Sequence, residues 1–191
     1  MADTDITTQR PRRSLRAGGP EQHFAELPVL ADLVKLRPFQ HEDALAFLGR
    51  LRSSTTPEEA VTYTAFAAVP TDATGWAYEC LRLMADHLQP QERQMMQQVA
   101  AWLAHPTVRT RHDLMRDALW APVRGPSVLL ALAVGWSTGG PAPNDSEPAP
   151  VHKTPVAINS AVLSCLARVP MNRRSVYLAR ILDMAQALYR V

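Results

Sequence analysis

Apolar positions along the chain recur with helical spacing, and prolines divide them into separate segments. In the last segment Tyr177, Ile181, Met184 and Leu188 follow one another at steps of three or four residues, which places them on one face of a helix. The alternation of apolar and polar residues that marks a half-buried strand is not sustained anywhere in the sequence. The pattern therefore predicts an all-α protein.

Residues suited to helix ends stand at the edges of these segments. Thr56-Pro57-Glu58-Glu59 combines a capping threonine, a proline at the first helical position and a glutamate that can complete a capping box. Similar boundary signals occur at His41-Glu42-Asp43, Gln89-Pro90, Pro106-Thr107, Ser127, Gly139-Gly140 and Thr154-Pro155. We predict about seven or eight helices, packed as antiparallel helical hairpins.

The same reading divides the chain into a tail and one domain. Residues 1–25 are polar and basic around Arg10 to Arg16, so we expect a disordered basic N-terminal tail. Residues 26–191 should form a single helical domain, with a long loop rich in glycine and proline at 137–153. The apolar stretch from Phe24 to Leu36 is interrupted by Pro28 and fits either a short helix or an extended segment.

Composition excludes some classes of partner and compartment. The net charge of +2 is too small to predict an obligate nucleic-acid or membrane partner. Cys80 and Cys165 stand far apart, which is typical of reduced, buried thiols in a cytosolic protein. No apolar run approaches the length of about 18 residues that a membrane span needs. Arg12-Arg13 resembles an export signal, but no apolar segment follows it. We expect a cytoplasmic protein.

One stretch matches a catalytic pattern. Gly135-Trp136-Ser137-Thr138-Gly139 fits the Gly-x-Ser-x-Gly nucleophile elbow of serine hydrolases, which needs a strand before the serine and a helix directly after it. The residues that follow, from Gly140 to Asp145, are unsuited to start a helix, and His152 is the only histidine further along the chain. We interpret the match as the end of a helix, with a serine hydrolase using Ser137 as the alternative.

Other chemistry finds no support in the sequence. The histidines lack the spacing that places two metal ligands on one helix face, and neither a Walker A nor a Gly-x-Gly-x-x-Gly pattern occurs. We therefore expect no catalytic residue, no cofactor and no metal site.

A protein partner is the remaining expectation, and a few residues are candidates for contacting it. Of four tryptophans, Trp76, Trp102 and Trp120 are expected mainly in the core, whereas Trp136 borders the Gly/Pro-rich loop and can anchor a partner. Basic residues form two clusters, which fit either an acidic partner, a weak nucleic-acid contact or an ordinary solvated surface. The hypothesised partner-binding residues are Trp136, Arg109, Arg116, Arg173 and Arg174.

Several segments between about Leu30 and Val191 together resemble a known family. They are Glu42-Asp43-Ala44-Leu45-Ala46-Phe47-Leu48, Pro57-Glu58-Glu59-Ala60-Val61, Ala100-Ala101-Trp102-Leu103, His105-Pro106-Thr107, Gly135-Trp136-Ser137-Thr138-Gly139-Gly140 and Asn159-Ser160-Ala161-Val162-Leu163. The chain resembles an uncharacterised bacterial family of small helical proteins with a Trp-Ser-Gly-Gly motif before a proline-rich loop. Here Thr138 is inserted between Ser137 and Gly139.

The resemblance implies an all-helical fold without assigned catalytic residues. It also implies an association with specialised secretion gene clusters, type VI among them. We therefore expect a non-enzymatic protein-interaction module, an accessory or adaptor of a bacterial secretion-type machine. Its partner would be another protein of that machine, and the sequence leaves the oligomeric state open.

Overall fold

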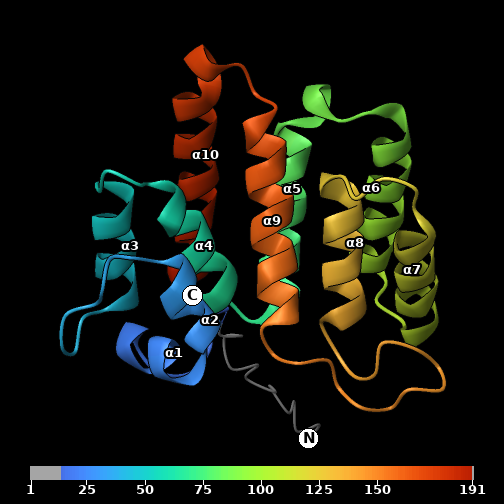
Figure 1. Ribbon diagram of the computed structural model, residues 1–191, viewed down its shortest axis with the longest axis horizontal. Coiled ribbons are helices and arrows are strands. Elements are labelled where there is room, and N and C mark those ends of the chain that lie inside the picture. The colour runs from blue at the N-terminus through green and yellow to red at the C-terminus, as the bar shows by residue number, and fades with distance from the viewer. Residues whose placement is uncertain (1–13, 191) are drawn as a thin grey trace, which may run out of the picture.

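A computed structural model describes residues 14–190, and within that range the protein is built from α-helices without any β-strand (Figure 1). The helices are α1 (Pro20–Glu26), α2 (Pro28–Leu33), α3 (Ala44–Arg52), α4 (Glu58–Ala67), α5 (Pro70–Leu83), α6 (Pro90–Ala104), α7 (Val108–Trp120), α8 (Pro126–Trp136), α9 (Lys153–Ala167) and α10 (Met171–Tyr189), with a 3-10 turn at Ala85–His87. The all-α prediction is confirmed. The described residues form ten α-helices rather than seven or eight, in part because Pro20 and Pro28 each begin a short helix.

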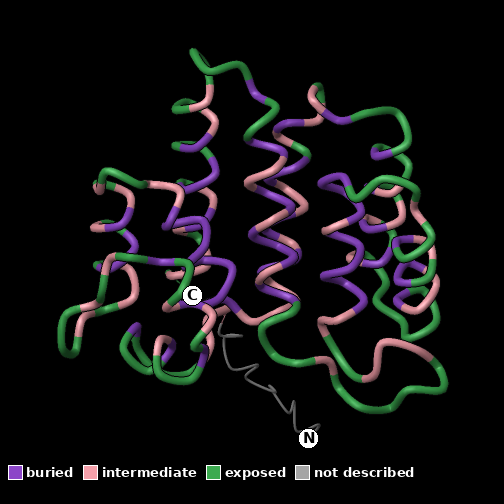
Figure 2. Tube along the Cα trace, in the orientation of Figure 1, coloured by how far each residue is buried: buried purple, intermediate pink, exposed green. Residues whose placement is uncertain are grey.

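Helix α9 lies at the centre of the molecule (Figure 1). It packs against α4, α5 and α8, while α6 and α7 cover the far side of α8 and α3 and α10 pack against α4. Because α9 contacts helices that are distant in the sequence, the predicted series of helical hairpins is not confirmed. Residues of α4, α8 and α9 are buried on nearly every side, and these helices form the core (Figure 2).

Local capping explains where several helices begin. The Asp43 carboxylate accepts hydrogen bonds from the backbone N–H groups of Leu45 at 2.8 Å and Ala46 at 3.2 Å, which starts α3. The hydroxyl of Thr107 accepts from the backbone N–H of Thr110 at 3.1 Å and caps α7, as predicted. These caps depend on neighbouring residues alone, so the sequence could predict them.

The start of α4 differs from the prediction. No side chain caps this helix, and Glu59 does not complete a capping box. Its carboxylate instead accepts from the backbone N–H groups of Lys35 at 3.0 Å and Leu36 at 3.2 Å. Glu59 therefore joins α4 to the segment after α2, a contact that local sequence does not encode.

Part of the predicted tail, from residue 14 onwards, belongs to the fold. Arg16 donates its backbone N–H to the Ala67 carbonyl at 2.8 Å, and Pro20 begins α1. His23 of α1 is 1% exposed, with Nδ1 3.3 Å from the Tyr63 hydroxyl, and burial lowers the pKa of its imidazole. The prediction of a disordered tail is wrong for residues 14–25, and the part at 1–13 lies outside the described residues.

The two cysteines agree with the prediction of reduced, buried thiols. Cys80 and Cys165 are both buried and unpaired, and burial raises the pKa of Cys165 to about 12. Across residues 14–190, none of the helices has the length and apolar character needed to cross a membrane.

Candidate partner-binding surface

The Gly-x-Ser-x-Gly match forms the end of a helix. Ser137 follows the last residue of α8, and its hydroxyl donates to the Val134 carbonyl at 2.8 Å. Gly139 has a φ of +57°, the left-handed conformation common after a helix end. The chain then runs without a helix until α9 starts at Lys153. The strand–serine–helix geometry of a nucleophile elbow is therefore not formed around Ser137.

Two residues of α7 hold this helix end. Arg111 is only 4% exposed and donates to the Gly135 carbonyl at 2.8 Å. Its other terminal nitrogen lies 3.1 Å from Nε2 of His112, and that Nε2 lies 3.2 Å from the Gly140 carbonyl. A ring nitrogen serves as either donor or acceptor, so the tautomer of His112 decides which of the two contacts is a hydrogen bond. Burial lowers the pKa of the Arg111 guanidinium.

Close contacts favour glycine at two positions of this stretch. A Cβ atom on Gly135 would lie 2.4 Å from the Met115 sulfur, and one on Gly140 would lie 1.7 Å from the Asp145 carbonyl oxygen. The first contact lets α7 and α8 approach closely, and the second closes a turn within the long loop. The contact at Gly135 and the positive φ of Gly139 thus account for the two glycines of the Gly-x-Ser-x-Gly match.

Trp136, the predicted anchor, is partly buried. Its ring packs against the core, and the Lys153 ammonium lies 5.3 Å from the ring centroid. Whether it contacts a partner stays a prediction.

Trp120 is much more exposed than Trp136. It ends α7 and is 84% exposed, whereas Trp76 and Trp102 are 5% and 4% exposed. The expectation that Trp120 lies in the core is therefore wrong. Helix α7 buries Leu114 and Ala118, and a residue two positions beyond Ala118 points away from that face. The spacing of Leu114 and Ala118 in the sequence was a signal that could have found Trp120.

Two residues close to Trp120 in the chain are also apolar and exposed. Leu119 is 50% exposed and Val123 is 72% exposed, and we call these two residues with Trp120 the Trp120 surface. Beside it lies a hollow of about 300 Å³ between α7 and the long loop. The hollow is lined by His112, Met115, Arg116, Leu119, Trp120, Pro141 and Pro143, among others.

The predicted basic residues are not brought together. Arg109 is exposed near the start of α7, and Arg116 pairs with Asp113 at 2.8 Å and Asp117 at 3.0 Å. The other two arginines belong to α10, on the opposite side of the molecule from α7 (Figure 1). Only Arg116 lines the hollow next to Trp120.

The α10 arginines have neighbours of their own. The Arg173 guanidinium lies 5.6 Å from the Tyr177 ring centroid, and Arg174 donates to the Ala167 carbonyl at 2.9 Å, near the end of α9. The described part of the chain holds no cluster of three or more histidine, cysteine or acidic residues placed to bind a metal.

These features define a small, all-helical protein with an exposed aromatic surface at the end of one helix. The family of unknown function DUF6931 matches residues 47–189, and the chain belongs to this family. Membership of an uncharacterised family is thereby confirmed. No curated protein and no solved structure matches the chain. The matched span contains both Trp120 and Trp136, whereas α1 and α2 precede it.

Proposed function

We propose that the protein is a non-enzymatic protein-interaction module that binds its partner through the Trp120 surface. The observation that carries the proposal is the 84% exposure of Trp120 between two further exposed apolar residues. Tryptophan is enriched among the residues that dominate binding energy at protein interfaces. Exposing such a ring without a partner leaves a large apolar area in water.

The surroundings of Trp120 have the composition of an interface. Protein interfaces combine an apolar centre with a polar rim. Here the rim holds Arg116 together with the carboxylates of Asp113 and Asp117, so it carries both signs of charge. Pro141 and Pro143 of the long loop extend the apolar area across the neighbouring hollow. This arrangement suits a protein partner with a protruding apolar side chain.

The identity of the partner is a further part of the proposal. The resemblance described above supports an adaptor or accessory role in a bacterial secretion-type machine, with the protein in the cytoplasm. Of the contacts predicted from the sequence, Arg116 adjoins the Trp120 surface. Trp136, Arg109, Arg173 and Arg174 remain predictions of the sequence alone and are not part of the proposed surface.

Co-purification from the native host tests the proposal. Tagged wild-type protein and the variants Trp120→Ala and Trp136→Ala would be compared by quantitative mass spectrometry, after thermal melts show that each variant is folded. We expect specific partners to be lost with Trp120→Ala and retained with Trp136→Ala. Recovery of components of a secretion machine would support the proposed role as an adaptor or accessory of such a machine. Partners retained by Trp120→Ala would contradict the proposed surface.

The hydrolase alternative gains no support from the geometry of Ser137. Its hydroxyl bonds to a carbonyl of its own helix, and the turn lacks the elbow geometry that activates a nucleophilic serine. Nucleic-acid binding through the arginines is likewise not favoured, because Arg116 is paired with carboxylates and α10 lies across the molecule from α7 (Figure 1).

A further inference from the structure

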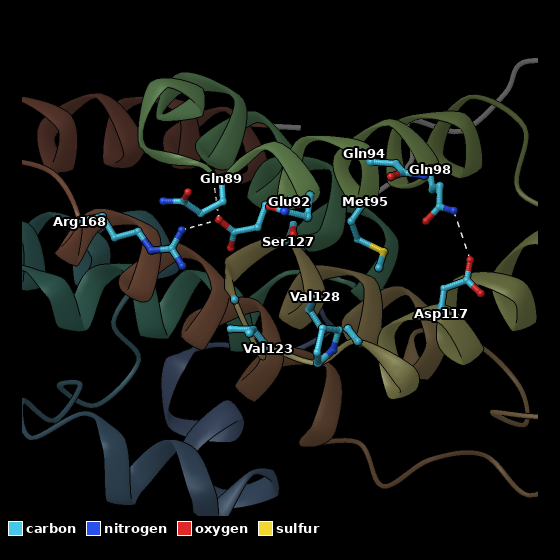
Figure 3. Close-up of a pocket in the computed structure, with 14 residues that line it drawn as sticks. Gln89, Glu92, Gln94, Met95, Gln98, Asp117, Val123, Ser127, Val128 and Arg168 are labelled. Carbon is cyan, nitrogen blue, oxygen red and sulfur yellow. Dashed lines mark hydrogen bonds and ion pairs between the residues drawn. The ribbon is translucent and has the colours of Figure 1, made fainter.

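A groove separates α6 from the connection between α7 and α8 (Figure 3). Its volume is about 510 Å³, within the range of small-molecule sites. Met95 points into the groove from α6, and Val123 and Val128 face it from the other side (Figure 3). The middle of the groove is therefore apolar.

One end of the groove holds a buried carboxylate that is only half satisfied. Glu92 is 8% exposed, and its Oε2 accepts from the Gln89 backbone N–H at 2.8 Å and from the Arg168 guanidinium at 2.5 Å. Its other oxygen, Oε1, is buried and has no hydrogen-bond partner. The hydroxyl of Ser127, also in the groove lining, is buried without a partner as well. Native proteins satisfy the great majority of such buried polar groups.

Gly125 permits this arrangement. A Cβ atom at this position would lie 2.0 Å from Glu92 Oε1, so a side chain there would displace the carboxylate. Without one, Glu92 reaches the first turn of α8, where Ser127 also lies (Figure 3). Two unsatisfied oxygen atoms thus occur in the same end of one groove.

The charges of the lining indicate which ligand fits. The lining contains the carboxylates of Glu92 and Asp117 but only one cationic side chain, Arg168, whose guanidinium is already bonded to Glu92. At the far end Asp117 accepts from the Gln98 side chain at 3.2 Å. An ionised carboxylate is an acceptor only, so Glu92 Oε1 requires a donor. Hydrogen bonds between charged groups are roughly twice as strong as neutral ones.

We propose that this groove binds a small organic cation, a primary amine or amidine on an apolar body. The cationic head donates to Glu92 Oε1 and Ser127 Oγ, and the apolar body lies on Met95, Val123 and Val128. Val123 lines this groove and also belongs to the Trp120 surface, but the proposal rests on the two unsatisfied oxygens, which lie outside that surface.

Three probes of similar shape test the head group. Cyclohexylmethylamine, cyclohexanecarboxamide and cyclohexanecarboxylate share one apolar ring and differ in charge. Each is titrated into full-length protein with ¹³C-labelled methionine methyl groups. Met95 reports on the groove, and Met84, which is fully buried in the core, serves as the internal control. We expect saturable shifts of Met95 with the amine, weaker binding of the amide and no binding of the carboxylate.

Two variants connect the binding to the named oxygens. Glu92→Gln should weaken binding of the amine by about tenfold, since a charge-assisted hydrogen bond becomes a neutral one. Because Glu92 also binds Arg168, this variant carries a risk of misfolding. Ser127→Ala removes only the unsatisfied hydroxyl and should weaken binding by about threefold. Ser164→Ala is the matched control, because that hydroxyl bonds to the Ala161 carbonyl within α9 and should leave binding unchanged.

Three results would overturn the assignment. They are the absence of a saturable Met95 shift with the amine, binding of the carboxylate as tight as that of the amine, and amine binding that folded Ser127→Ala and Glu92→Gln leave unchanged.

Discussion

Two neighbouring helices of this protein end in a tryptophan, and the two rings have opposite environments. Trp136 ends α8, packs against the core and lies under the Lys153 ammonium. Trp120 ends α7 and is 84% exposed. The chain around Trp136 carries the conspicuous Gly-x-Ser-x-Gly pattern, whereas the chain around Trp120 carries no recognisable motif. The conspicuous motif reflects steric constraints on the backbone around Trp136. The residues of the candidate interface around Trp120 form no motif that stands out in the sequence.

The difference has a physical basis. Around Trp136, Gly135 must admit Met115, Gly140 must admit the Asp145 carbonyl and Gly139 must adopt a positive φ. Such steric demands leave a trace in the sequence, because few other residues meet them. Exposure of Trp120 follows only from which face of α7 packs on the core. The comparison predicts that substitutions near Trp136 change stability, and that those at Trp120 change binding.

The largest effect on stability is expected at Arg111. Replacing it in Arg111→Met removes the charged donor to the buried Gly135 carbonyl and should lower the free energy of unfolding by about 2 kcal/mol. Chemical denaturation measures the change. Arg109→Met, which alters an exposed arginine on the same helix, is the matched control and should stay within about 0.5 kcal/mol of wild type. Equal effects of the two variants would show that Arg111 does not hold the end of α8.

Trp136→Ala and Trp120→Ala test the comparison itself. Truncating the partly buried Trp136 should cost about 1–2 kcal/mol, less than for a fully buried tryptophan, because part of the ring already contacts water. Truncating Trp120 should change stability by less than about 0.5 kcal/mol. Thermal melts of both variants and the wild type at one protein concentration measure these two changes in stability. A larger loss for Trp120→Ala would contradict its exposed position.

Gly139→Ala is expected to have a smaller effect. The φ of +57° at Gly139 places an L-residue in the left-handed region, which costs about 1 kcal/mol relative to glycine. Gly49→Ala is a suitable control, because Gly49 lies in α3 and a Cβ atom there meets no neighbour within 4 Å. Alanine should be neutral or stabilising at that position. Denaturation midpoints that fall equally in both variants would argue against strain at Gly139.

The smallest effect is expected at Ser137. Ser137→Ala removes one hydroxyl that bonds to the Val134 carbonyl, so the loss of stability should be below about 1 kcal/mol. A fluorophosphonate probe should label neither wild type nor variant. Labelling of wild type that disappears in Ser137→Ala would instead support the hydrolase alternative.

The features that depend on adjacent residues could be predicted from the sequence. The cap at Thr107, the helix start at Gln89-Pro90 and the interpretation of Gly139-Gly140 as a helix end all follow from local geometry. Glu59 does not form the predicted capping box, because its hydrogen-bond partners lie in another segment of the chain. Helix α1 falls within the predicted tail, and its attachment to the fold depends on the burial of His23 next to Tyr63.

The candidate sites depended even more on tertiary structure. The groove brings together α6, the connection after α7 and Arg168 at the end of α9, and no local pattern relates these segments. The exposure of Trp120 depends on which face of α7 packs against the core, and that face is the one with Leu114 and Ala118. The charge of Arg116 predicts a partner contact, and the structure places this residue in the same hollow as Trp120.

Site-specific photo-crosslinking in the native host tests the central claim most directly. A photoreactive residue would replace Val123, 72% exposed beside Trp120, or Val151, 63% exposed in the loop after Trp136. The proposed function predicts a specific crosslinked partner from position 123 that Trp120→Ala abolishes, and none from position 151. A specific crosslink from position 151 alone would place the interface at the loop beside Trp136 and contradict the assignment to the Trp120 surface.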